Sequence, residues 1–193
     1  EYYFSLEALR QALFRDADMR ESNMFGELTL ALDQALLRSL AHLPSTATPF
    51  SLNLNVQSCF TKPFEAFLEQ APAGQLTIEF RQPNIVEFYD EYVIARSMLE
   101  NKGIRIAVDG ILPDTIRLVS MEYVGAAMAK VSWGEGAADS FRARAKALAY
   151  ILESGIELVI NRVDEKAAIS LGNAFGIDRF QGRLLDDLAR RAA

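Results

Sequence analysis

The sequence predicts an α/β fold built from successive βα units, and three observations indicate it. From residue 50 onward, short apolar or alternating runs alternate with longer stretches of helical periodicity. The predicted strands recur roughly every 22 to 29 residues, about the length of one βα unit. Glycine follows two predicted helices, at Lys102-Gly103 and Ser154-Gly155, where a helix end favours a left-handed residue. The pattern favours a mostly parallel sheet.

The predicted strands span residues 51–57, 75–80, 104–109, 126–133, 156–162 and 177–181. The predicted helices between them span residues 63–70, 85–101, 115–124, 139–154 and 165–175. The first fifty residues differ, because apolar residues at helical spacing predict two helices, over 6–14 and 28–40, before a loop. We find no dividing linker and expect one domain over residues 1–193, with a helical part over 1–50 and βα units over 51–188.

Composition excludes several classes of protein. The chain has 193 residues, half of them hydrophobic, which is enough for one substantial core. A net charge of -6, with acidic and basic residues mixed along the chain, offers no cationic stripe, so we expect no nucleic-acid binding. No apolar run is long enough to predict insertion into a membrane, and the single cysteine excludes an internal disulfide. We expect a cytoplasmic protein.

Six strands with interleaved helices suit either an open doubly wound sheet or an incomplete (β/α) barrel. A dinucleotide-binding sheet requires a glycine-rich turn after its first strand, but the sequence there is Asn55-Val56-Gln57-Ser58. No Walker-type phosphate loop is present either. The nucleotide-binding open sheet is therefore disfavoured.

Short motifs at the ends of the predicted strands separate these folds further. They read Leu52-Asn53-Leu54-Asn55, Ile78-Glu79-Phe80-Arg81-Gln82, Ala107-Val108-Asp109-Gly110, Ala129-Lys130-Val131-Ser132, Ile160-Asn161-Arg162-Val163-Asp164 and Phe180-Gln181-Gly182. In order and spacing they resemble the EAL domain, the cyclic di-GMP (c-di-GMP) phosphodiesterase family, which typically reads V-N-L-S, L-E-I-T-E, A-L-D-D-F, L-K-I-D, A-E-G-V-E and Q-G-Y. The resemblance covers about residues 25–188. It implies a modified TIM-type barrel with its site at the carboxyl ends of the strands.

The resemblance also implies a role for each matching residue. Asn53, Glu79 and Asp109 match metal-ligand positions of the family, and Lys130 matches the lysine that helps to orient the attacking water. Gln181, in the last motif, completes the set of vestigial or ligand-binding positions. A buried lysine needs a carboxylate partner, and we expect Lys130 to pair with Asp109 or Glu79.

Three acids of the family are missing. Gly110 replaces the second aspartate of the D-D pair, Ser132 the aspartate after the lysine, and Asn161 the glutamate of A-E-G-V-E. The family's chemistry uses two Mg or Mn ions, which need hard, charged oxygen ligands to activate water. We therefore expect no bound metal and no hydrolysis, so the chain is interpreted as a degenerate EAL domain and not an enzyme.

The name-giving tripeptide occurs as Glu7-Ala8-Leu9, but on a predicted helix, with Gln11 where the family has arginine. We do not interpret Glu7 as the metal-binding glutamate of the family. The usual first strand with its Y-Q-P segment is also missing. The barrel is therefore expected to be incomplete or remodelled at its N-terminal side.

Three functions remain as alternatives. The first is a non-catalytic regulatory or protein-interaction domain in bacterial signalling, with a protein partner or an upstream signalling domain. The second is a c-di-GMP receptor that binds without hydrolysis, and the third is an active phosphodiesterase, which the missing acids disfavour. Trp133 would either plug the former site or stack a base, and we favour the plug. A homodimer is left open, because the segment after Asp109 departs from the family's dimerising loop.

Overall fold

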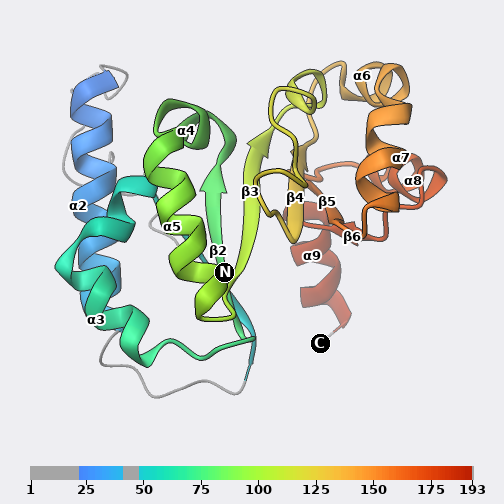
Figure 1. Cartoon of the computed structure of the whole chain (residues 1–193). Helices are drawn as coiled ribbons and strands as arrows, with labels where there is room; N and C mark the ends of the chain where they lie inside the picture. Colours follow the sequence, from blue (N-terminus) through green and yellow to red (C-terminus); the bar gives the residue numbers. More distant parts are fainter. Residues whose placement is uncertain (1–21, 41–47, 193) are drawn as a thin grey trace. The chain divides into compact units, whose positions relative to one another are not determined.

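Figure 1 shows a computed structural model of the chain, which describes residues 22–40 and 48–192. The described residues form two compact units. Unit 1 comprises the described residues up to Phe80 together with Glu87–Arg105, and unit 2 comprises Arg81–Val86 and the described residues from Ile106 onward. Whether these units act as the single domain expected over 1–193 stays a prediction.

Unit 1 is a parallel strand pair covered by helices. Its elements are α2 (Ser22–Leu40), β1 (Phe50–Asn53), the 3-10 helix η1 (Val56–Phe60), α3 (Lys62–Gln70), β2 (Leu76–Arg81) and α5 (Tyr89–Asn101). Strands β1 and β2 pair in parallel, with Phe50 opposite Leu76 and Asn53 opposite Glu79. The second helix predicted in the N-terminal part is confirmed as α2, which begins earlier than expected.

Apolar residues at helical spacing form the core of unit 1. Helix α3 begins with a proline in its first turn and buries Phe64, Phe67 and Leu68. Helix α5 buries one face, on which Tyr92 meets Phe80 of β2 edge to face, with ring centroids 5.6 Å apart. These contacts hold the helices against the strand pair.

Unit 2 contains the remaining parallel strands. Its elements are α4 (Gln82–Glu87), β3 (Arg105–Ile111), the 3-10 helix η2 (Pro113–Thr115), β4 (Met128–Ser132), α6 (Ala137–Ala143), α7 (Ala145–Glu153), β5 (Glu157–Asn161), α8 (Lys166–Ala174), β6 (Arg179–Phe180) and α9 (Arg183–Ala192). The strands lie in the order β3-β4-β5-β6, and each pairs in parallel with the next.

The strands of unit 2 are buried on both faces. Residues 129–132 of β4 and 158–160 of β5 are all buried, as is typical of parallel sheets covered by helices. Helix α7 packs against β5, as Figure 1 shows. The burial of Lys130 and Ser132 within such a strand is chemically unusual, because most polar side chains avoid the interior.

Several predicted boundaries were wrong. The helix expected over 115–124 is a short 3-10 helix followed by turns. Side-chain hydroxyls form hydrogen bonds with the backbone there and so stabilise turns in place of a helix. The Thr115 hydroxyl is hydrogen-bonded to the backbone of Leu112, and the Ser120 hydroxyl accepts a hydrogen bond from the Tyr123 amide.

Other elements were also corrected. The strand expected over 51–57 ends at Asn53, and η1 follows it. The long helices expected over 85–101 and 139–154 are each divided in two, at Phe88 and Arg144. Helix α9 was not predicted.

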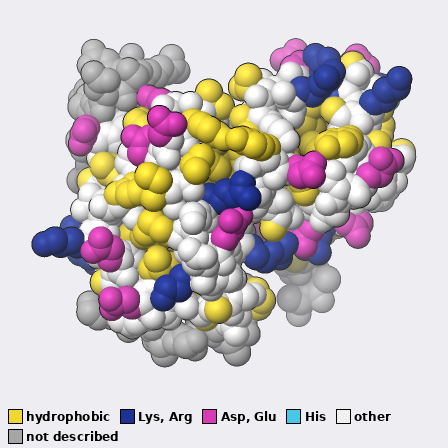
Figure 2. Space-filling model, viewed as in Figure 1, with side chains coloured by type: hydrophobic (Ala, Val, Ile, Leu, Met, Phe, Trp, Pro, Cys, Tyr) yellow, Lys and Arg dark blue, Asp and Glu magenta, His cyan; other side chains and the backbone are white. Residues whose placement is uncertain are grey.

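The helix expected over 6–14, with Glu7-Ala8-Leu9, lies outside the described residues. No helix in the described part is long and apolar enough to cross a membrane. On the face displayed in Figure 2, Lys and Arg side chains are interspersed with acidic and apolar ones.

Candidate functional site

In unit 1, two of the predicted site residues lie side by side at the carboxyl ends of the strands. Asn53 ends β1 directly opposite Glu79 of β2, and the amide of Leu54 donates to the Glu79 carbonyl at 3.1 Å. Asn53 is half-buried, whereas Glu79 is only 2% exposed. A carboxylate this deeply buried must be compensated by polar neighbours. The pair provides oxygen-bearing side chains at one edge of the strand pair.

A buried acid that the sequence did not reveal fixes the turn after β1. Oδ2 of Asp33, on α2, accepts hydrogen bonds from the Asn55 amide at 2.7 Å, from Asn55 Nδ2 at 2.8 Å and from Ser58 Oγ at 2.6 Å. Burial raises the pKa of the Asp33 carboxyl, and these hydrogen bonds oppose the rise. The cluster joins α2 to the loop that follows Asn53, and so holds that strand end in place.

In unit 2, an amide meets a carboxylate across the strand ends. Asn161 ends β5, and its Nδ2 donates to Oδ1 of Asp109 on β3 at 2.8 Å. Ser132, at the end of β4, lies opposite Asn161 in the register and is 5% exposed. The Oδ1 atom of Asn161 is buried without a hydrogen-bond partner among the described residues. Positions 132 and 161, where the resemblance implies acids, are therefore neighbours in the sheet, and Asn161 bonds Asp109.

Lys130 lies two residues before Ser132 on β4, on the same face of the strand, and is 5% exposed. Val108 is opposite Ala129 in the register, so Asp109 and Lys130 follow paired residues on adjacent strands. This placement is compatible with the expected ion pair, which stays a prediction, as does the convergence of the unit 1 and unit 2 residues at one site.

Gly110 has a backbone conformation that disfavours the aspartate that the resemblance implies at this position. Its φ is +69°, and the pairing of β3 with β4 shifts register between Val108 and Ile111. A Cβ atom at Gly110 would lie 3.5 Å from Nε of Arg81. An acid at this position would be strained by about 1 kcal/mol, and its carboxylate would be drawn to the guanidinium. Glycine relieves the strain and leaves Arg81 without that acidic neighbour.

A cavity of about 490 Å³ opens beside the ends of β4 and β5, lined by residues 133–138 with Arg162, Asp164 and Glu165. Trp133 in its wall is 8% exposed, donates from Nε1 to Glu165 Oε1 at 2.7 Å, and packs on Phe141 with centroids 5.8 Å apart. Trp133 is thus held in place from two sides. That it plugs the former site stays a prediction.

Gln181 extends the ladder beyond β6 through its backbone. Its amide donates to the Ile160 carbonyl at 2.9 Å and its carbonyl accepts from the Val163 amide at 3.0 Å, while its side chain is exposed. A Cβ atom on Gly182 would lie 2.3 Å from the Val163 nitrogen. The backbone therefore explains the glycine of the Gln181-Gly182 motif, because only a residue without a Cβ atom permits this close approach to Val163.

The donor set of the described residues does not form a metal centre. No three His, Cys, Asp or Glu side chains within the described ranges gather closely enough to hold an ion. Mg and Mn ions at hydrolytic sites are held mainly by carboxylates. At the unit 2 strand ends, the Asp109 carboxylate accepts a hydrogen bond from the NH₂ group of Asn161. A cation beside Asp109 would need a second oxygen ligand at that place, and an NH₂ group cannot serve as one.

No family model and no curated protein sequence matches this chain. Solved structures do. The structure is similar to the EAL domain of Pseudomonas aeruginosa FimX bound to c-di-GMP, with a TM-score of 0.58 and 12% identity over 85% of this chain and 71% of that chain. It is similar to the EAL domain of Mycobacterium smegmatis DcpA, with a TM-score of 0.62 and 18% identity over 86% of this chain and 81% of that one.

A third similar structure is the manganese and c-di-GMP complex of Klebsiella pneumoniae BlrP1, with a TM-score of 0.62 and 15% identity, over 86% of this chain and 45% of that chain. These likenesses define the class of fold as a TIM-type α/β barrel. More particularly, the chain has the fold of EAL domains, as the strand-end motifs predicted. The described part holds six strands, two fewer than a complete barrel of eight, which is consistent with the incomplete barrel that the sequence predicted.

Proposed function

We propose that this chain is a non-catalytic EAL-fold domain that acts in c-di-GMP signalling as a regulatory or protein-interaction domain. The observation that supports this most strongly is the hydrogen bond from Asn161 Nδ2 to Asp109 Oδ1, 2.8 Å long. The amide presents protons to the carboxylate oxygen that the family gives to a metal. A divalent ion and an N–H donor cannot occupy the same lone pair of that oxygen.

The charge at the strand ends also supports a non-catalytic domain. Gly110, Ser132 and Asn161 are neutral where the family carries acids, so three negative charges are missing. Two divalent ions bring four positive charges into one site, and carboxylates normally balance them. Water activation by two metals would therefore lack both ligands and charge balance, and the domain would act through contacts instead of turnover.

A second candidate, a c-di-GMP receptor that binds without hydrolysis, is favoured by one specific observation. Asn161 Oδ1 is buried and, among the described residues, accepts no hydrogen bond. A buried acceptor of this kind usually has a partner, and a ligand N–H group such as those of guanine would supply one. This second function leaves the non-catalytic proposal intact.

Calorimetric titration with c-di-GMP, with and without Mg, Mn or Ca ions, separates the two candidates. No heat of binding under any condition favours the protein-interaction domain. Binding that is independent of metal and weakened in Asn161→Ala favours the receptor. Binding that requires metal would contradict the proposal, because it would require a metal centre at the strand ends.

A gain-of-function variant is the matched control. The triple change Gly110→Asp, Ser132→Asp and Asn161→Glu restores the family's acids, and we expect it to recover Mn binding only in part. The strain at position 110, where φ is +69°, opposes the first of these changes. Turnover is not expected in this variant, because metal ligands act as a unit.

A further inference from the structure

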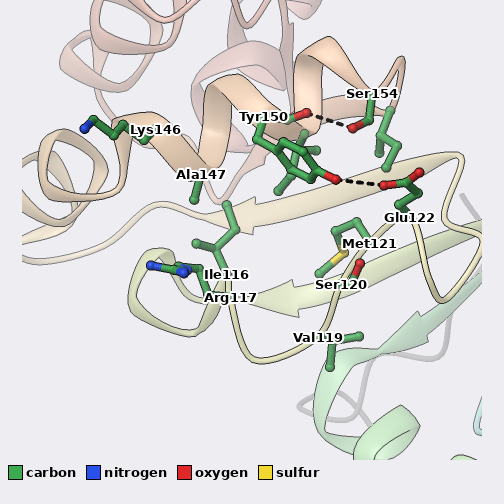
Figure 3. A pocket seen from close by; sticks show the side chains of 12 residues that line it. Ile116, Arg117, Val119, Ser120, Met121, Glu122, Lys146, Ala147, Tyr150 and Ser154 are labelled. Carbon is green, nitrogen blue, oxygen red and sulfur yellow. Dashed lines mark hydrogen bonds between the residues drawn. The ribbon is translucent and has the colours of Figure 1, made fainter.

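Unit 2 contains a second cavity, of about 470 Å³, which we call the α7 pocket. It lies between the irregular segment 116–122 and helix α7 (Figure 3). The aliphatic part of its lining comprises Ile116, Val119, Met121, Ala147, Ile151 and Ile156. It shares no lining residue with the strand-end positions or with the cavity beside Trp133. One wall of the pocket is formed by segment 116–122, which has turns and no regular helix.

The two ends of the α7 pocket differ in charge. Figure 3 shows Arg117 and Lys146 at one end and the pair of Tyr150 and Glu122 at the other. Arg117 and Lys146 are exposed, and neither forms an ion pair with the acids of the described residues. Two cations at one mouth of an apolar cavity attract an anion.

The nearest acid along the chain does not neutralise this end. Asp114 is already engaged, since its carboxylate lies 3.6 Å from Arg144 and accepts a hydrogen bond from Ser140 at 3.1 Å. At the opposite end, the Tyr150 hydroxyl donates to Glu122 at 2.9 Å, and that hydrogen bond raises the pKa of Tyr150. The Glu122 carboxylate repels an anion, so a ligand would bind in one direction only.

We propose that the α7 pocket binds a medium-chain aliphatic carboxylate, with its head group at Arg117 and Lys146 and its chain along the aliphatic floor. The volume lies within the range of about 300 to 1,000 Å³ typical of small-molecule sites. Tyr150 is the only aromatic residue of the lining, and its hydroxyl is bound to Glu122. The lining therefore suits an alkyl chain better than a nucleobase, which requires an open aromatic face for stacking.

The proposal is tested with purified chain and decanoate, below its micelle concentration, by calorimetric titration. We expect saturable binding, with octanoate weaker by up to about fourfold for each methylene removed. Decanol and decyltrimethylammonium, which carry a neutral and a cationic head, should bind much less tightly. The variant with both Arg117→Gln and Lys146→Gln should bind decanoate about tenfold more weakly.

Two further variants separate this site from general adsorption. Ala147→Leu fills the pocket from α7 and should weaken decanoate binding, whereas Arg142→Gln, an exposed change on α6, should leave it unaltered. Circular dichroism verifies the fold of each variant. Equal binding of decanoate by all variants, equal binding of the cationic amphiphile, or no binding at all would overturn the proposal. Self-association of the chain that Ala147→Leu abolishes would overturn it too, since the pocket would then be an interface between copies.

Discussion

Replacing Asp33 by alanine is expected to destabilise the folded chain by about 3 kcal/mol. Asp33 Oδ2 accepts three hydrogen bonds, and among them are those from the amide of Asn55 and the hydroxyl of Ser58. Ser58 is completely buried, so water cannot replace the carboxylate there. Each buried donor left without a partner costs about 1 to 3 kcal/mol, while the exposed part of Asn55 can turn to solvent.

Thermal unfolding followed by circular dichroism measures this loss. For a chain of this size, 1 kcal/mol corresponds to a shift in Tm of roughly 2 to 4 °C, so Asp33→Ala should lower Tm by roughly 6 to 12 °C. Asp33→Asn is the matched control, because its amide oxygen can accept the same hydrogen bonds without a buried charge. A Tm for Asp33→Ala within about 2 °C of the natural chain, or equal losses for both variants, would refute this role of Asp33.

The carboxyl group of Asp33 also makes the stability of the folded chain depend on pH. Burial raises the pKa of Asp33 above its ordinary 3.8, so the folded chain binds the proton more tightly than the unfolded chain does. The stability contributed by this group is complete below pH 3.8 and is lost as the pH rises through the folded-state pKa. Asp33→Asn cannot titrate, so the stability of the natural chain relative to this variant should fall across that window and then stay constant.

Two other substitutions test the packing around the unit 2 strand ends. Gly182→Ala should destabilise by roughly 2 to 4 kcal/mol, because its Cβ would overlap the backbone of Val163, whereas Gly134→Ala, whose Cβ meets nothing within 4 Å, should be close to neutral in urea unfolding. Equal effects would mean that the close approach is not essential. Trp133→Phe should cost about 1 kcal/mol through the lost hydrogen bond to Glu165, and an unchanged urea midpoint would show that this bond contributes nothing.

Much of the fold could be predicted from the sequence. Strand β5 contains the apolar run Leu158-Val159-Ile160, and β4 begins within the apolar run of residues 126–129. Such runs are typical of strands that are covered on both faces, so both strands are recognisable in the sequence. Segment 115–124 was mistaken for a helix, because its apolar residues suggest one while the hydroxyls of Thr115 and Ser120 stabilise turns. Helix α9 left a signal in Leu184, Leu185 and Leu188 that its many charges concealed.

The site was less predictable, because its contacts join residues far apart in sequence. The motifs placed Asn53 and Glu79 at strand ends, and the register confirms that they are neighbours. The motifs singled out Asn161 as a position where the resemblance implies an acid, but its bond to Asp109, 52 residues away, requires the folded sheet. Asp33 resembles an ordinary polar residue of a surface helix, and only the fold brings Ser58 and Asn55 to it.

The most direct test of the central claim is a hydrolysis assay. The purified chain is incubated with c-di-GMP and Mn or Mg ions, and the products are separated by chromatography beside an active EAL phosphodiesterase. We expect c-di-GMP to remain intact while the active enzyme releases linear pGpG. Sustained, metal-dependent release of pGpG by the natural chain, abolished in Glu79→Gln, would contradict the claim that the lost carboxylates have ended catalysis.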